Sequence, residues 1–205
     1  MAKRILPYRD YSEHDVVNLF SLDTSGENNG FVDWTEANPG KHDSGVVVKV
    51  SAGTLPGDLP GGLSKHASGE ELRKYLGASP TSAHIGYNAY PYNGMTVEPA
   101  DATDVALGIT LRETLAYDEN GEKLLYYKQK LDEAQAVLPG QTVPVLTRGL
   151  VLLDSNAVTG NPGIGAQLEV GADGTLVADT SAGNALVATV VAKSGSDKFL
   201  CKISF

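Results

Sequence analysis

The sequence predicts a mainly β protein, either a small antiparallel β-barrel or a sandwich. Its 23 glycines and 10 prolines are typical of a chain with many turns and few long helices. Apolar and polar residues alternate in several short segments, which is the period-2 pattern of half-buried strands. Short strands at this spacing, joined by glycine-rich turns, favour a sandwich or a barrel. With 205 residues, the chain can bury one sizeable core and carry an arm or an insertion.

Charge and cysteine usage restrict the partners that we expect. The formal net charge is −9 with the acids spread along the chain, which disfavours binding to nucleic acid or to an anionic membrane. No run approaches the ~20 apolar residues of a membrane span. Pro7, Arg9 and Asp10 interrupt any signal-peptide core, so we expect synthesis in a reducing cytoplasm. The lone Cys201 excludes an internal disulfide, and its place in an alternating segment favours a buried strand position over a reactive thiol.

Residues 1–44 are expected to form an N-terminal arm rather than a domain. Ser12 can open a short helix, with Asp15 three residues on as its capping partner. Four apolar anchors follow, too few to form a core: Val16, Val17, Leu19 and Phe20. The rest of the arm has loop composition, with Trp34 among its few anchors. Such a segment docks on something else, and the sequence leaves open whether that is its own domain or a neighbour.

Residues 45–205 are expected to form the β domain, which begins with a strand at 45–52. A loop-rich insertion follows at about 53–94 and carries one predicted short helix, 70–76, with Ser68 as its N-cap and Gly77 after its end. Three tyrosines lie further along this insertion: Tyr87, Tyr90 and Tyr92. Exposed tyrosine rings on a loop are typical of interfaces, because the ring gives contact area at low entropy cost. The alternative is that these rings cap the open end of a barrel.

The pattern is consistently β from residue 95 onward. Leu107, Ile109 and Leu111 alternate with polar or small residues, as in a half-buried strand. Asn120-Gly121 predicts a type I′ hairpin turn, with 124–128 as the returning strand. Further strands are expected in the segments 142–153, 166–170, 175–178, 185–192 and 199–205, with a turn at Asp173-Gly174. The last strand would tie the C-terminal segment into a sheet.

No segment carries the pattern of a catalytic, metal or cofactor site, so we expect a non-enzymatic protein. His42, Asp43 and Ser44 stand side by side, whereas triad members meet in space, and the Gly-x-Ser-x-Gly elbow is missing. The four histidines are isolated from one another and from the cysteine, which disfavours zinc. The acidic loop at 23–30 fails the EF-hand pattern, and the glycine-rich segment at 160–165 lacks the strand and helix of a nucleotide site.

Three segments carry a resemblance to a known class of proteins. Residues 4–11 (RILPYRDY), 117–124 (YDENGEKL) and 137–149 (VLPGQTVPVLTRG) resemble virion structural proteins of tailed phages, in particular large contractile-tailed phages of cyanobacteria. The C-terminal pattern, with Thr-Arg-Gly and a later Asp-Gly turn, is similar to small β-barrel proteins that decorate or cement phage heads. The insertion at 53–94 matches nothing in that class.

The resemblance implies a capsid decoration, or cement, protein that stabilises contacts between capsomers on the outer surface of the expanded head. It implies the major capsid protein as partner, a homo-oligomer with a trimer favoured by three-fold sites, and a location on the virion. Weak contacts repeated over many copies would provide avidity. The expected contact residues are Tyr8, Arg9, Tyr11, Phe20 and Trp34, followed by Tyr87, Tyr90 and Tyr92.

Three alternatives remain open at the level of sequence. A phage tail or neck component belongs to the same class and differs in copy number per virion. A host-glycan adhesion protein would use the tyrosine-rich loop near Tyr90 as its binding face. A hydrolase would require His42 or His84 to meet a carboxylate in space.

Overall fold

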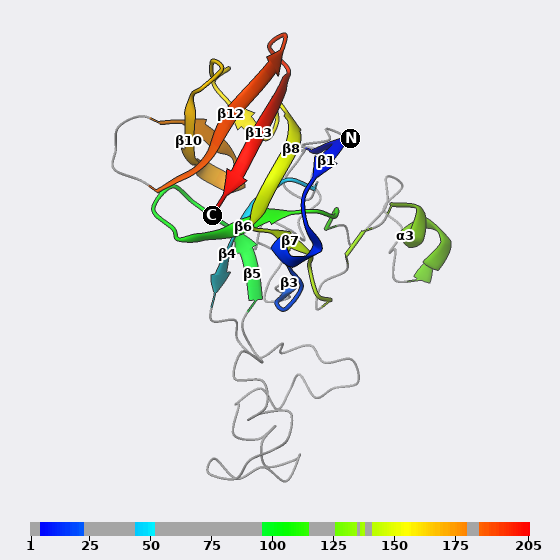
Figure 1. The fold of residues 1–205 in the computed structure, drawn as a ribbon. Coiled ribbons are helices and arrows are strands. Elements are labelled where there is room, and N and C mark those ends of the chain that lie inside the picture. The colour runs from blue at the N-terminus through cyan, green and yellow to red at the C-terminus, as the bar shows by residue number, and fades with distance from the viewer. Residues whose placement is uncertain are drawn as a thin grey trace, which may run out of the picture.

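The computed structural model describes residues 5–22, 44–51, 96–114, 126–134, 136–137, 141–179 and 185–205. These residues form two β-sheets, which confirms the predicted mainly β class (Figure 1). Neither sheet closes on itself within this part of the chain, so the architecture is consistent with the sandwich and not with the barrel. The predicted insertion helix at 70–76 and the Asn120-Gly121 turn lie outside the described residues.

The larger sheet has seven strands in the order β1-β8-β13-β12-β10-β11-β9. Its strands are β1 (Ile5–Asp10), β8 (Arg148–Asp154), β9 (Val158–Thr159), β10 (Gln167–Val170), β11 (Leu176–Ala178), β12 (Leu186–Ser194) and β13 (Lys198–Ser204). All neighbours are antiparallel except β9 and β11. The long strand β13 lies between β8 and β12 in the middle of the sheet (Figure 1).

The smaller sheet has six strands in the order β2-β7-β6-β4-β5-β3. Its strands are β2 (Val16–Val17), β3 (Ser21–Leu22), β4 (Val47–Ser51), β5 (Thr96–Pro99), β6 (Ala106–Thr110) and β7 (Val145–Leu146). Only the pair of β3 and β5 is parallel. The predicted strands at 45–52 and 107–111 are therefore confirmed as β4 and β6.

The described part of the arm pairs with the chain's own sheets. Strand β1 pairs with β8 of the seven-stranded sheet, whereas β2 and β3 pair with β7 and β5 of the six-stranded sheet. Between them lies a single 3-10 turn, η1 (Glu13–Asp15), and the side chain of Ser12 accepts a hydrogen bond from the backbone N–H of His14 at 3.3 Å. The predicted helix at Ser12 is no longer than this turn because Val16 is already extended. Residues 5–22 thus dock on their own domain.

One predicted strand is wrong in the part that the structure describes. The returning strand at 124–128 ends in the first residue of helix α3 (Lys128–Ala134). The helix sequence KQKLDEA consists mostly of strong helix formers, and this local preference decides its structure. By contrast, the Asp173-Gly174 turn is confirmed within η4 (Ala172–Gly174), where both residues have positive φ angles, 55° and 69°.

The main core lies between the two sheets. Its largest fully buried side chains include Phe199, Ile203 and Leu153 from the seven-stranded sheet and Ile109 and Leu146 from the six-stranded sheet. A second buried cluster consists of Val46, Val48, Val97, Val137, Val143 and Val145, with Phe20 and Leu107 packed against it. Because successive side chains of a strand point to opposite faces, this second cluster covers the other face of the six-stranded sheet. That sheet is therefore buried on both faces.

The turn at Asp173-Gly174 connects the sheets at one end. The backbone N–H of Gly174 donates to the carbonyl oxygen of Ala100 at 2.9 Å, and that of Asp173 donates to Oδ1 of Asp101 at 3.2 Å. A Cβ on Gly174 would lie 2.4 Å from Cγ1 of Val46. Only glycine allows this close approach at a positive φ angle.

Candidate contact surface

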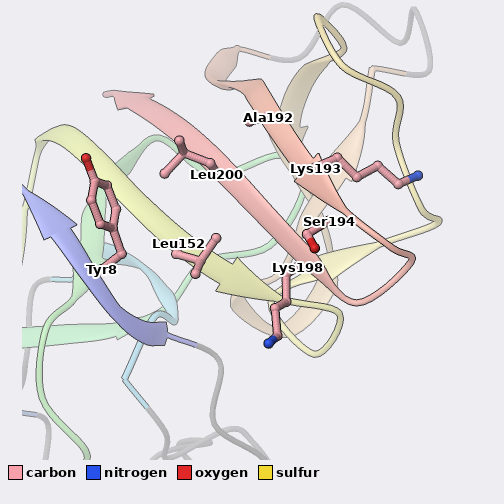
Figure 2. Close-up of a pocket in the computed structure, with 7 residues that line it drawn as sticks. All are labelled: Tyr8, Leu152, Ala192, Lys193, Ser194, Lys198 and Leu200. Atoms are coloured by element: carbon pink, nitrogen blue, oxygen red, sulfur yellow. The ribbon is translucent and has the colours of Figure 1, made fainter.

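An apolar row crosses the outer face of the seven-stranded sheet. On β13, Phe199, Cys201 and Ile203 point into the core, so Leu200 points outward. Leu200 lies opposite Leu152 of β8 and opposite Ala192 of β12. Tyr8 of the edge strand β1 lines the same hollow, and its side chain stands beside Leu152 (Figure 2). We call Tyr8, Leu152, Leu200 and Ala192 the apolar row.

The apolar row is hollowed and accessible. Its residues, together with Lys193, Ser194 and Lys198, line a cavity of about 330 Å³ on the sheet surface (Figure 2). Tyr8 is 52% exposed, and Leu152 and Leu200 are half-buried. The row therefore presents apolar area that a partner could cover, on strands whose backbones are already held by hydrogen bonds to their neighbours.

The edge of the apolar row is basic in an otherwise acidic chain. Lys198 and Lys202 are exposed on β13, on the same face as Leu200. Residues 185–205 contain three lysines and one aspartate, although the whole chain has a net charge of −9. The Lys193 ammonium is held at the side of the sheet, where it donates to Oδ1 of Asn161 and lies 5.6 Å from the centroid of the Phe199 ring. Asp154 of β8 lies opposite Lys198, so the positive charge beside the row comes chiefly from Lys202, and it favours a partner with a carboxylate near the apolar contact.

A second hollow, of about 440 Å³, lies where β1 and the turn after it meet the segment that follows β6. It is lined by Arg9, Tyr11, Glu13, Val16, Asn18, Leu111, Arg112 and Pro144, and we call it the arginine hollow. Nη1 of Arg9 donates to the carbonyl oxygen of Leu111 at 3.4 Å, which holds this guanidinium against the wall.

The structure places the predicted contact residues in different environments. Tyr8 and Arg9 are exposed neighbours on β1, but they line different hollows. Tyr11 is half-buried against the main core, and Phe20 is half-buried against the second cluster. The remaining four, Trp34, Tyr87, Tyr90 and Tyr92, lie outside the described residues. The described four thus do not form one patch.

Sequence reasoning missed Leu152, Leu200 and Ala192 as surface residues. A signal for Leu200 exists, because it occupies the outward position between Lys198 and Lys202 in a strand whose inward positions are already apolar. No local signal brings Leu152 beside it, because that contact depends on the pairing of β8 with β13.

The described ionisable groups with shifted pKa values have structural explanations. Lys49 of β4 forms ion pairs with Asp104 at 2.8 Å and with Glu98 at 3.3 Å. The hydrogen bond between Lys49 and Asp104 raises the pKa of the lysine and lowers the pKa of the carboxyl. Burial raises the pKa of Cys201 to about 12, so its thiol stays protonated, and its predicted buried strand position is confirmed.

The described part of the chain holds no candidate metal site and no membrane-spanning helix. It contains no group of three or more His, Cys, Asp or Glu residues that could hold a metal ion. None of its helices is long and apolar enough to cross a membrane. Of the three adjacent residues His42, Asp43 and Ser44, only Ser44 falls within the described residues, and it is buried.

Comparison with known proteins found no relatives. No protein-family model matches the chain, and no match was found among curated proteins or solved structures.

Proposed function

We propose that this chain is a non-enzymatic virion structural protein of a tailed phage, which decorates the expanded head and stabilises contacts between capsomers. The observation that carries the proposal is the apolar row with its basic edge on the outer face of the seven-stranded sheet. The class of protein rests on the resemblance of residues 4–11, 117–124 and 137–149 to phage structural proteins. The proposed partner is the major capsid protein.

The apolar row suits a protein contact for energetic reasons. Covering apolar surface contributes roughly 25 cal/mol per Å², and an aromatic side chain such as Tyr8 adds contact area at low entropy cost. The row spans four hydrogen-bonded neighbouring strands, β1, β8, β13 and β12, so its backbone loses little freedom on binding. A single contact of this size is weak, and repetition over a symmetric shell would supply the avidity.

The test is co-sedimentation of the purified chain with expanded heads and with unexpanded procapsids. We expect saturable binding to expanded heads alone. The double variant Tyr8→Ser/Leu200→Ser should weaken that binding by more than about tenfold, because each change removes apolar contact area. Val105→Ser is the matched control, since Val105 is 90% exposed and lies outside the apolar row. Circular dichroism should show that all variants keep the β fold.

Two results would contradict the proposal. If the double variant and the control bind expanded heads equally well, the apolar row is not part of the contact. Binding to neither form of the head would refute the decoration role, and antibody labelling of intact virions would then show whether the protein lies on the tail or neck.

A further inference from the structure

The arginine hollow combines two guanidinium groups that come from distant parts of the sequence. Arg9 belongs to β1 and Arg112 to the segment after β6, and they are two of only five arginines in the chain. Within the described residues, neither forms an ion pair with a carboxylate. The hollow also carries the carboxylate of Glu13, so its lining has two positive charges and one negative charge and keeps a net positive charge.

The geometry leaves these groups able to donate to a ligand. Arg9 uses Nη1 for a long hydrogen bond of 3.4 Å to the Leu111 carbonyl oxygen, so other N–H groups of this guanidinium are available. Arg112 is exposed and follows Leu111 directly, which places it next to the anchored Arg9. A single guanidinium group binds a planar carboxylate through two parallel hydrogen bonds, and such charged bonds are among the strongest in proteins.

The remaining walls indicate the kind of carboxylate. Val16, Leu111 and Pro144 give the hollow an apolar side that fits the methylene groups of a side chain. Glu13 lies on the same hollow, where it would repel a bare anion and accept a hydrogen bond from a backbone N–H. A ligand that satisfies all three features has a carboxylate, a short aliphatic stem and amide N–H groups.

We propose that the arginine hollow binds a glutamate or aspartate side chain on an extended peptide segment of a partner protein. The cavity of about 440 Å³ lies within the usual range for small ligand sites, roughly 300–1,000 Å³. The site is separate from the apolar row and does not depend on the proposed decoration role.

The probe is the peptide N-acetyl-Ala-Glu-Ala-amide, titrated into the ¹⁵N-labelled full-length chain and followed by ¹H–¹⁵N NMR. We expect saturable shifts at the side-chain N–H groups of Arg9, Arg112 and Asn18, with a dissociation constant in the millimolar range. The matching glutamine peptide should cause no saturable shift, since it lacks the charge.

Variants then separate the site from general charge effects. Arg9→Gln and Arg112→Gln should each raise the dissociation constant by about tenfold or more, because each removes charged hydrogen bonds. Lys198→Gln is the control, since it removes one positive charge from the other hollow and should leave the titration unchanged. An equal loss in the Lys198→Gln chain would overturn the proposal.

Inorganic phosphate tests the alternative of an adventitious anion site. Phosphate offers charge without a stem or amide groups, so we expect weaker shifts than those caused by the glutamate peptide. Phosphate shifts as large as the peptide's, with the same dependence on Arg9 and Arg112, would refute the peptide site. The absence of any saturable shift with the glutamate peptide would refute it too.

Discussion

The two sheets differ in how many of their faces are buried. In the six-stranded sheet, the successive residues Val46, Val47 and Val48 are all fully buried, because clusters cover both faces. In the seven-stranded sheet, the inward residues of β13 are buried while Lys198 and Lys202 are exposed. The six-stranded sheet thus supplies core, and the seven-stranded sheet supplies both core and an accessible face. We therefore expect the contact surface on the seven-stranded sheet, because its outer face is accessible.

The strongest test of this comparison places a charge on the second face of each sheet. Val48→Asp would bury an unpaired carboxylate and should cost at least about 3 kcal/mol of unfolding free energy, enough to prevent folding in a marginally stable domain. Leu200→Asp puts the same group on the outer face of the seven-stranded sheet, where water reaches it, and should leave a folded protein. Chemical denaturation followed by circular dichroism measures both. Unfolding of the Leu200→Asp chain would contradict the accessible face.

Thiol reactivity sharpens the contrast between the two faces of β13. Cys201 points inward with a pKa of about 12, so a thiol reagent should modify it only after unfolding. The variant Leu200→Cys in a Cys201→Ser background moves the thiol one residue to the outer face. It should react about a thousandfold faster or more, because its thiolate fraction returns to the ordinary value. Similar rates for the two native proteins would disprove the assigned orientation of the strand.

A glycine tests how tightly the six-stranded sheet is packed. A Cβ on Gly108 would lie 2.3 Å from the Leu146 carbonyl oxygen and 2.7 Å from Cγ1 of Val145. Gly108→Ala should therefore lower the unfolding free energy by about 1–3 kcal/mol. Gly163→Ala is the matched control, with no atom within 4 Å of its Cβ and an expected change near zero. Thermal unfolding compares the two, and equal melting temperatures would contradict the tight packing.

The smallest effect concerns the partly exposed ion pairs of Lys49 on β4. Because Asp104 has a lowered pKa when folded, its contribution is present above its ordinary value of 3.8 and is lost as the pH falls through the folded value. The contribution of Lys49, whose pKa is raised, is present below 10.5 and is lost as the pH rises through the folded value.

Lys49→Met should accordingly cost less than about 1 kcal/mol at neutral pH, since both partners are partly exposed. It should also flatten the loss of stability in acid. Denaturant titrations across the pH range measure this, with Lys202→Met as the control for an exposed lysine that the structure shows outside any ion pair. If the Lys49→Met chain loses stability in acid as steeply as the unchanged chain, the ion pair does not contribute to the pH dependence.

Local patterns predicted most of the described strands but not the candidate surface. The strand at 199–205 shows the alternation of apolar and polar residues, and the turn at 173–174 shows the Asp-Gly pair. Both were therefore predicted from the local sequence. Tyr8 was named as a contact on the resemblance to phage structural proteins, and that role stays a prediction. Leu152 was not named, because its exposure depends on lying on the outer side of a strand paired with residues far along the chain. Helix α3 was missed because the predicted hairpin extended into it.

The central position of β13 has a consequence for when this protein can fold during synthesis. β13 forms hydrogen bonds with β8 on one edge and with β12 on the other, and residues of β1 join the same sheet from the start of the chain. Strand β8 therefore cannot pair with β13 until the ribosome has released the segment around Ser204. Until then, the newly made strands expose apolar faces, and contacts that span almost the whole chain form last and slowly. Folding of this domain is therefore expected to finish only after β13 has left the ribosome, later than the synthesis of its other strands.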